Sequence, residues 1–452
     1  MDLKNINSVY FLGIGGIGMS ALARFFKNIG KEVAGYDKTP TDLTNALIAE
    51  GIKITFEDNL ESLMKNPDLL VFTPAIPKNH FQLNYYKENG FRLYKRAEVL
   101  GIIANSMFNI SIGGSHGKTS TSSITAHIFK NSGEDVAAFL GGIAVNYQSN
   151  FLQGNTYAIA EADEFDRSFL QLNPNILLLT SIDTDHLDIY GSFENILASF
   201  KLFTNNLRPD GKLILNSRVD KNVIHPNQSV YFYSLENEQA DFYGYNIRIE
   251  NGTYFFDVKT PNGIWSNLVS NYGGRHNIEN AIGALAIAYF AGIKEEKIRI
   301  AIESFRGVKR RFEVHVKKDN LVYIDDYAHH PREIDATLNA VKELYPNKKV
   351  TACFQPHLFS RTNDLFKEFG ESLSKIEEVV LLDIYPAREL PMEGVTSKLI
   401  FDQITGPKKY LSTKKDLLNL LMELNPEVLV TIGAGDIDTM IEPIKNLFNQ
   451  MP

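Results

Sequence analysis

The stretch VYFLGIGGIGMSALA, residues 9–23, joins an apolar run, a glycine-rich turn and an amphipathic segment. Its four glycines match the pattern in which a strand, a tight turn and a helix N-terminus hold the phosphates of a dinucleotide. Asp37 follows the next apparent strand, 32–36, where an acidic side chain meets a ribose in such sites. The stretch predicts a Rossmann-like βαβ unit that binds NAD or another phosphate-bearing ligand, and a purely structural turn is the alternative.

The composition indicates a globular protein of several domains. At roughly 150 residues per domain, 452 residues allow about three. The formal net charge of −8 disfavours a nucleic-acid partner, whose binders usually carry a basic surface. A single cysteine, Cys353, cannot form an intrachain disulfide, and we expect a cytoplasmic protein with no membrane insertion, because no signal-like or membrane-spanning apolar run occurs.

The chain is expected to form three α/β domains, at 1–105, 106–307 and 308–452. Short apolar runs alternate with helical patterns in the first and last segments, which is typical of parallel sheets. In the middle segment, a Tyr- and Phe-rich stretch at 229–269 is expected to form antiparallel strands. The predicted class is α/β, with a Rossmann-like N-terminal domain, a central P-loop ATPase-type domain and a Rossmann-like C-terminal domain.

A second phosphate loop is predicted at 114–119, Gly-Ser-His-Gly-Lys-Thr, between an expected strand at 108–113 and an expected helix at 120–131. Backbone N–H groups there can hold phosphates, Lys118 can reach the β- and γ-phosphates, and the Thr119 hydroxyl can bind Mg²⁺. Ile112 stands where the strict pattern has its first glycine. A structural turn is again the alternative, but two nucleotide loops in one chain favour an ATP-driven enzyme whose substrate is itself a nucleotide.

Two acidic clusters, 161–166 and 183–188, follow expected strands at 157–160 and 176–180. Carboxylates at strand ends beside a triphosphate loop are placed to hold Mg²⁺, which prefers oxygen ligands. His186 lies in the second cluster, either as a metal ligand or as a solvated, charge-paired histidine. Acidic clusters are usually exposed faces, so only their position after strands indicates a site.

Further polar groups lie near the expected helix 277–291 and after later strands. Asn277 and Asn280 share a helix face and could contact an adenine edge, although Asn277 could instead cap the helix. Polar clusters at 310–311, 325–331 and 355–362 are candidate phosphate and carboxylate contacts, or structural salt bridges.

Together these motifs resemble the Mur ligase family, the ATP-dependent amide ligases of peptidoglycan synthesis. The most specific segments are 15–19, 114–119, 161–164, 185–188, 274–280, 325–331, 355–357 and 433–437. The resemblance implies a UDP-sugar domain, a central ATPase domain and a C-terminal domain on the amino-acid side. It also implies UDP-N-acetylmuramate and L-alanine as substrates, ATP and Mg²⁺ as cofactors, and an acyl-phosphate intermediate.

The resemblance also implies roles for individual residues. UDP-sugar binding is expected from Gly15, Gly16, Ile17, Gly18, Met19 and Asp37. ATP binding is expected from Gly114, Ser115, His116, Gly117, Lys118, Thr119, Ser120, Asn277, Asn280, Arg311 and Asp325. Catalytic roles are expected for Lys118, His329, His330 and Arg361, and metal binding for Thr119, Glu161 and His186.

Leu358 and Lys201 also bear on these roles. The family usually has arginine where this chain has Leu358, so Arg361 becomes the better candidate for that substrate contact. Lys201 lies 201 − 186 = 15 residues after His186, a spacing at which related ligases carry a carbamylated lysine that binds Mg²⁺. The alternative is an ordinary exposed helix lysine.

Three other functions would explain part of these motifs. A ligase of the same family that adds a preformed peptide to the same UDP-sugar is the nearest. An NAD-dependent dehydrogenase would leave the loop 114–119 without a role. A nucleotide-gated regulatory protein would leave the acidic clusters and the C-terminal polar groups without one.

Overall fold

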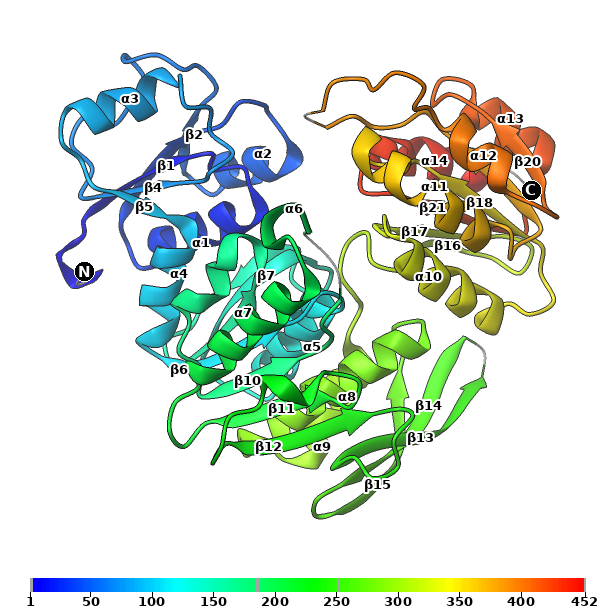
Figure 1. The fold of residues 1–452 in the computed structure, drawn as a ribbon, viewed down its shortest axis with the longest axis horizontal. Helices are drawn as coiled ribbons and strands as arrows, with labels where there is room; N and C mark the ends of the chain where they lie inside the picture. Colours follow the sequence, from blue (N-terminus) through cyan, green and yellow to red (C-terminus); the bar gives the residue numbers. More distant parts are fainter. Residues whose placement is uncertain (1–2, 184–186, 251, 388, 451–452) are drawn as a thin grey trace. The chain divides into compact units, whose positions relative to one another are not determined.

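The structure is a computed structural model that describes residues 3–183, 187–250, 252–387 and 389–450. Helices and strands alternate through three separate sheets, which confirms the predicted α/β class (Figure 1). The chain divides into two compact units: Met1–Ile247, Phe256–Val269 and Glu279–Phe305 form the first, and Arg248–Phe255, Ser270–Ile278 and Arg306–Pro452 form the second.

A parallel five-stranded sheet begins the first unit, in the order β3-β2-β1-β4-β5. Its strands are β1 (Ser8–Leu12), β2 (Glu32–Tyr36), β3 (Lys53–Thr55), β4 (Leu69–Phe72) and β5 (Leu93–Lys95). The helices are η1 (Leu3–Asn5), α1 (Ile17–Asn28), α2 (Asp42–Ala49), α3 (Phe81–Glu88) and α4 (Arg96–Asn105). Side chains alternate along β1, so that Tyr10 packs with α3 and Phe11 packs with α1 and α4. The strand order reverses beside β1, where ligands bind in sheets of this kind.

The ten-stranded sheet has the order β15-β14-β13-β12-β11-β10-β6-β9-β7-β8. Its strands are β6 (Phe108–Gly113), β7 (Val136–Ala144), β8 (Ser149–Leu152), β9 (Tyr157–Ala162), β10 (Ile176–Leu179), β11 (Lys212–Asn216), β12 (Ser229–Ser234), β13 (Phe242–Glu250), β14 (Thr253–Thr260) and β15 (Gly263–Ser270). The helices of this part are α5 (Lys118–Asn131), η2 (Phe165–Gln171), α6 (Leu187–Tyr190), α7 (Phe193–Asn205), η3 (Lys221–Val223), α8 (Arg275–Phe290) and α9 (Glu295–Ser304).

The expectation of antiparallel strands across 229–269 is wrong for its first part. The strand β12 pairs in parallel with both β11 and β13. By contrast, β14 and β15 are neighbours joined by two residues, and so short a link can only reverse the chain. The aromatic pattern indicates strands, but the direction of each strand depends on the path of the chain between them.

The six-stranded sheet of the second unit has the order β16-β17-β21-β18-β19-β20. Its strands are β16 (Glu313–Lys317), β17 (Val322–Asp326), β18 (Val350–Phe354), β19 (Glu378–Leu381), β20 (Lys408–Leu411) and β21 (Val428–Ile432). Only β16 is antiparallel to its neighbour. The helices are α10 (Pro331–Leu344), α11 (Phe359–Leu373), α12 (Lys398–Gln403), α13 (Leu417–Leu424), η4 (Asp436–Met440) and α14 (Ile441–Gln450). The parallel strands end at one edge of the sheet, where segments 327–330, 355–358 and 433–436 follow.

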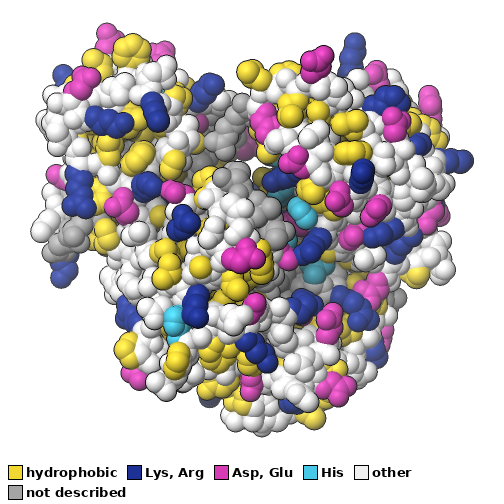
Figure 2. All heavy atoms as spheres, in the orientation of Figure 1, with side chains coloured by type: hydrophobic (Ala, Val, Ile, Leu, Met, Phe, Trp, Pro, Cys, Tyr) yellow, Lys and Arg dark blue, Asp and Glu magenta, His cyan; other side chains and the backbone are white. Residues whose placement is uncertain are grey.

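The surface mixes charges of both signs. On the face drawn in Figure 2, Lys and Arg side chains are interspersed with Asp and Glu. Among the described residues, no helix has both the length and the apolar character needed to cross a bilayer.

Candidate active site

The loop 114–117 lies at the centre of the ten-stranded sheet. It follows β6, which pairs in parallel with β9 on one side and β10 on the other, so the ends of both neighbours flank the loop. Gly114 has a φ of +127°, and a Cβ there would lie 2.2 Å from Thr180 Oγ1. Gly117, with a φ of +81°, precedes α5 and leaves that helix without a side-chain cap. Only glycine fits these positions, and the uncapped N–H groups form an anion site.

The ammonium of Lys118 lies inside this loop. Its Nζ donates to Gly114 O at 2.6 Å and to Ser115 O at 3.3 Å. Glu164 Oε1 accepts a hydrogen bond from the same Nζ at 3.0 Å, and Glu164 Oε2 lies 2.9 Å from Nζ in the same ion pair. Burial by itself lowers the pKa of Lys118, but the carboxylates of Glu164 and Glu161 raise the pKa above its usual value. Lys118 is therefore a fixed positive charge at neutral pH.

Glu161 and Thr119, two predicted metal ligands, are in direct contact. Thr119 Oγ1 donates to Glu161 Oε1 at 3.0 Å, and Gly141 N donates to Glu161 Oε2 at 2.9 Å. Glu161 was expected just after a strand, but β9 continues through it to Ala162. A Cβ on Gly141 would lie 2.2 Å from Glu161 Oε2. The close approach of the carboxylate to β7 therefore depends on glycine at position 141.

The segment after β10 holds the other side of the loop. Ser115 N donates to Ser181 O at 3.0 Å, and Asp183 N donates to Ser115 Oγ at 2.9 Å. His116 N donates to Ser181 Oγ at 3.1 Å, and His116 Nε2 lies 3.5 Å from Asp183 Oδ2. The hydroxyls of Ser115 and Ser181 thus tie the loop to the second acidic segment. His186 lies outside the described residues.

The asparagines of α8 contact different groups. A Cβ on Gly117 would lie 2.7 Å from Asn280 Oδ1, so the Asn280 amide faces the loop. Asn277 Nδ2 donates to Gly273 O at 2.7 Å. Asn277 is not the helix cap, because α8 begins at Arg275. Ser120, in the first turn of α5, is 7% exposed.

The glycine-rich turn after β1 forms the second predicted nucleotide loop. Gly13 N donates to Tyr36 O at 2.8 Å, and Gly15 N donates to Asp37 Oδ2 at 2.7 Å. Asp37 therefore contacts the turn itself. Gly16 precedes α1 and gives the helix no side-chain cap. The Met19 side chain is 2% exposed and belongs to the core, which leaves only its backbone to meet a ligand.

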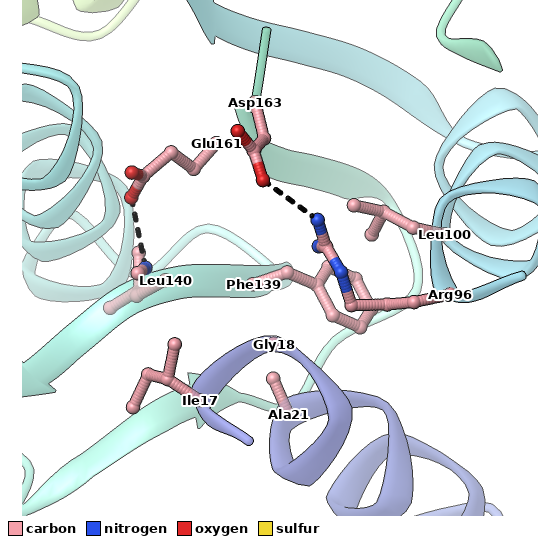
Figure 3. Close-up of a pocket in the computed structure, with 10 residues that line it drawn as sticks. Ile17, Gly18, Ala21, Arg96, Leu100, Phe139, Leu140, Glu161 and Asp163 are labelled. Atoms are coloured by element: carbon pink, nitrogen blue, oxygen red, sulfur yellow. Dashed lines mark hydrogen bonds and ion pairs between the residues drawn. The ribbon is translucent and has the colours of Figure 1, made fainter. Parts of the chain in front are cut away.

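A cavity of about 290 Å³ joins the glycine-rich turn to the acidic strand end (Figure 3). It is lined by Ile17, Gly18, Ala21, Arg96, Leu100, Phe139, Leu140, Gly141, Glu161 and Asp163. Figure 3 shows the guanidinium of Arg96 pointing toward Asp163, and the distance from Arg96 Nη2 to Asp163 Oδ2 is 3.0 Å. A Cβ on Gly18 would lie 2.9 Å from Arg96 Cδ. Arg96 thus lies between the N-terminus of α1 and the acidic segment.

Sequence reasoning did not single out Arg96 or Gly141. Asp163 and Glu164 lie in the predicted acidic cluster 161–166, but their contacts with Arg96 and Lys118 were not predicted. The one available signal was the basic pair Lys95–Arg96, which lies where β5 ends and α4 begins. Lys95 Nζ also forms an ion pair, with Asp166 Oδ2 at 2.7 Å.

Lys201 lies on the outer side of α7. Its side chain is exposed, whereas Ser199, Phe200 and Phe203 of the same helix are buried. Within the part of the chain that the structure describes, no three His, Cys, Asp or Glu side chains gather as a metal site. Metal binding by Lys201 stays a prediction.

In the second unit, Asp325 and Arg310 form a buried ion pair. Arg310 Nε lies 3.1 Å from Asp325 Oδ2, and Thr431 Oγ1 donates to Asp325 Oδ1 at 2.6 Å. Asp325 is fully buried. Arg310 Nη2 also donates to Gly433 O at 2.6 Å. These contacts tie the end of β17 to the segment after β21, so the predicted ATP ligand Asp325 also holds the local fold together.

Arg311 and Asp326 lie beside this pair. The Arg311 guanidinium stands 5.0 Å from the centre of the Tyr327 ring. Asp326 Oδ2 accepts from Phe312 N at 2.7 Å, and its Oδ1 accepts from Ala328 N at 2.7 Å. Burial raises the pKa of Asp326 to about 6, although the charge of Arg311 opposes the rise.

His329 follows β17 at the edge of the six-stranded sheet, and its neighbours determine which ring nitrogen carries the proton. Its Nδ1 is 3.0 Å from Tyr327 O and 3.4 Å from Glu333 Oε2. Both neighbours are acceptors, so Nδ1 carries the proton and Nε2 is left as the basic nitrogen. Burial lowers the pKa of His329, and the charge of Arg361 lowers it further, against Glu333. His329 is therefore neutral at pH 7 and lies within the field of Arg361.

His330 and His357 flank this histidine differently. His330 caps α10, and its Nδ1 accepts from Arg332 N at 3.4 Å. The His357 ring lies 6.3 Å from the His329 ring, centre to centre, and stacks on Tyr385 at 5.8 Å. Leu358 then adopts a φ of +73°, an unusual backbone conformation for a side chain that branches at Cγ. The edge of the six-stranded sheet thus gathers the predicted residues His329, His330 and Arg361.

Comparison with known protein families gives matches along most of the chain. Residues 8–107 match the "Mur ligase family, catalytic domain", residues 112–288 the "Mur ligase middle domain", and residues 310–435 the "Mur ligase, glutamate ligase domain".

Individual relatives match over the full length. The UDP-N-acetylmuramate–L-alanine ligase of Flavobacterium johnsoniae is 50% identical over 455 residues, which cover 100% of both chains. The crystal structure of UDP-N-acetylmuramate–alanine ligase from Thermotoga maritima superposes with a TM-score of 0.84 at 25% identity, over 98% of this chain and 99% of that one. A murein peptide ligase from Psychrobacter arcticus shares the fold, with a TM-score of 0.71 at 21% identity over 98% and 99% of the two chains.

Proposed function

Because the chain belongs to the Mur ligase family, we propose that it joins L-alanine to UDP-N-acetylmuramate in a reaction driven by ATP. The full-length relative at 50% identity, named for this reaction, supports the assignment. The cavity of Figure 3 is the structural observation that carries it, because one wall is Gly18 of the glycine-rich turn and another is Glu161, which touches Thr119 of the phosphate loop. A substrate bound at the turn would have its reacting end near ATP.

In this proposal the glycine-rich turn binds the UDP-sugar. The uncapped N-terminus of α1 faces its diphosphate, and Asp37 lies against the turn where a ribose would bind. The guanidinium of Arg96 adds a positive charge at the cavity wall. NAD is not required, because a ligase reaction contains no hydride transfer.

The loop 114–119 binds ATP with Lys118 on its phosphates. A lactyl carboxylate oxygen attacks the γ-phosphorus, the bond to the bridging oxygen breaks, and ADP leaves. The product is an acyl phosphate, whose phosphate is a far better leaving group than oxide. The loop and Lys118 position the phosphates and neutralise their charge, which is the main work of a protein in phosphoryl transfer.

Thr119 and Glu161 would hold Mg²⁺. A hydroxyl and a carboxylate oxygen 3.0 Å apart are hard donors of the type that this ion prefers. His186 and, if carbamylated, Lys201 are further ligands expected from the sequence. When bound, the ion would neutralise charge on the phosphates.

The second unit would receive L-alanine. The amine nitrogen attacks the acyl carbon, orthophosphate leaves, and the nitrogen loses a proton. Within the second unit, His329 is the candidate proton acceptor at Nε2, because it is neutral at pH 7 and its Nδ1 is already protonated. Arg361 is the candidate contact for the carboxylate of the amino acid, while Asn277, Asn280, Arg311 and Asp325 stay proposed ATP contacts.

A phosphate-release assay with three amine conditions tests the function. The enzyme receives ATP, Mg²⁺ and UDP-N-acetylmuramate together with L-alanine, a preformed tripeptide or no amine. We expect phosphate release with L-alanine and a product heavier than the UDP-sugar by one alanyl residue, measured by mass spectrometry. Release with the tripeptide alone would assign the chain to the peptide-adding reaction instead.

A further inference from the structure

The ammonium of Lys118 has no spare hydrogen-bond donor in this structure. An ammonium carries three N–H bonds, and the acceptors around Lys118 Nζ are Gly114 O, Ser115 O and the Glu164 carboxylate. A phosphate oxygen can therefore reach Lys118 only by replacing one of these three acceptors.

Glu164 is the acceptor that conflicts most with a phosphate. The carbonyls of Gly114 and Ser115 are neutral and belong to the loop itself, whereas Glu164 carries a negative charge within 3.0 Å of Nζ. Its side chain is 4% exposed, so water screens that charge weakly. An incoming triphosphate would meet this carboxylate at the same ammonium.

Two hydrogen bonds hold the backbone carbonyl of Glu164 in place. Tyr190 OH donates to Glu164 O, and Arg167 N donates to the same oxygen at 2.9 Å. Asp166 and Arg167, two and three residues after Glu164, both have left-handed φ values, of +51° and +54°. Two consecutive residues in this conformation are rare outside glycine and make a tight, specific turn. This turn fixes the backbone next to Glu164, whose side chain contacts Lys118 of the loop 114–119.

We propose that Glu164 is a positioning residue that holds Lys118 in the nucleotide-free enzyme and competes with the phosphates of ATP for its ammonium. The inference rests on the proposed ATP site at 114–119. In this proposal Glu164 lowers the affinity for the nucleotide, but it also keeps Lys118 oriented within the loop before the nucleotide binds. If Glu164 only stabilised the fold, replacing it would disturb the loop and weaken ATP binding, which is the opposite of the change expected here.

The test compares Glu164→Gln with the wild-type protein by isothermal titration with a non-hydrolysable ATP analogue in the presence of EDTA. Glutamine keeps the shape and the acceptor oxygen but removes the charge. We expect the analogue to bind at least threefold more tightly to Glu164→Gln. Unchanged or weaker binding by this variant, with an unchanged melting temperature, would overturn the proposal.

Two further variants keep the result interpretable. Asp166→Asn removes one charge from the same segment, but Asp166 pairs with Lys95 and not with Lys118, so its affinity for the analogue should equal that of the wild type. If Glu164→Gln unfolds, Glu164→Asp should instead tighten binding, because the shorter side chain weakens the contact with Lys118. Lys118→Ala separates the two proposals. If this variant binds the ATP analogue as tightly as the wild type, the ATP site at 114–119 is rejected. If Lys118→Ala loses binding but Glu164→Gln does not bind more tightly, only the role of Glu164 is rejected.

Discussion

Replacing Gly141 by alanine should disable ATP turnover while leaving the sheet intact. The new Cβ would lie 2.2 Å from Glu161 Oε2, whereas ordinary contacts begin near 3.4 Å. The carboxylate must therefore retreat by 3.4 − 2.2 = 1.2 Å, which moves it away from Gly141 N and changes its contact with Thr119. A displacement of about 1 Å at a reacting centre can cost about 100-fold in rate, which corresponds to about 2.7 kcal/mol.

The assay is steady-state phosphate release with L-alanine and UDP-N-acetylmuramate. The melting temperature serves as a control and should stay near the wild-type value, since the φ of Gly141 does not lie in the left-handed region that disfavours alanine. We expect kcat/KM for ATP to fall about 100-fold. A value within threefold of the wild type would refute the reasoning that Gly141 sets the position of Glu161.

Three other predictions concern charge. Glu161→Gln should lower activity and regain part of it at high Mg²⁺, because one anionic ligand is lost; an unchanged Mg²⁺ dependence of phosphate release would reject the assignment. Because Lys201 is exposed, Lys201→Ala should keep its activity, whereas inactivity rescued by a short carboxylate would establish a carbamate. For Asp326, the pKa of about 6 exceeds the ordinary 3.8, so the folded state retains a proton that the unfolded chain releases. The free energy of unfolding should therefore fall by up to about 3 kcal/mol as pH rises from about 4 to above 6. Urea titrations at several pH values should show that the free energy of unfolding of Asp326→Asn depends less on pH than that of the wild type. An equally steep pH dependence in the variant would contradict this prediction.

The sequence predicts the local units of the fold well, because turns and periodicity are local properties. The expected strands at 32–36 and 108–113 coincide with β2 and β6, and the expected helix at 277–291 matches α8 to within two residues at each end. The direction of β12 was missed, because it depends on how residues 235–241 cross between strands and not on the aromatic pattern.

The contacts within the site are less predictable from the sequence. Arg96 and Asp163 are 67 residues apart and belong to no shared motif. Gly141 belongs to no recognisable motif, and its role becomes visible only when the fold places Glu161 against it. The phosphate loop was recognisable because a single strand, turn and helix N-terminus build it. The contact between Gly141 and Glu161 exists only after β7 and β9 pair in the sheet, and the contact between Arg96 and Asp163 only after α4 packs beside the end of β9.

The short segment 161–166 has two sets of partners. Glu161 and Glu164 meet Thr119 and Lys118 of the phosphate loop, whereas the intervening Asp163 binds Arg96 beside the glycine-rich turn. A ligand that draws Arg96 away from Asp163 therefore acts on the same piece of backbone that aims the two glutamates. Thermodynamic linkage makes such an effect mutual: by whatever factor the sugar nucleotide alters the affinity for ATP, ATP must alter the affinity for the sugar nucleotide.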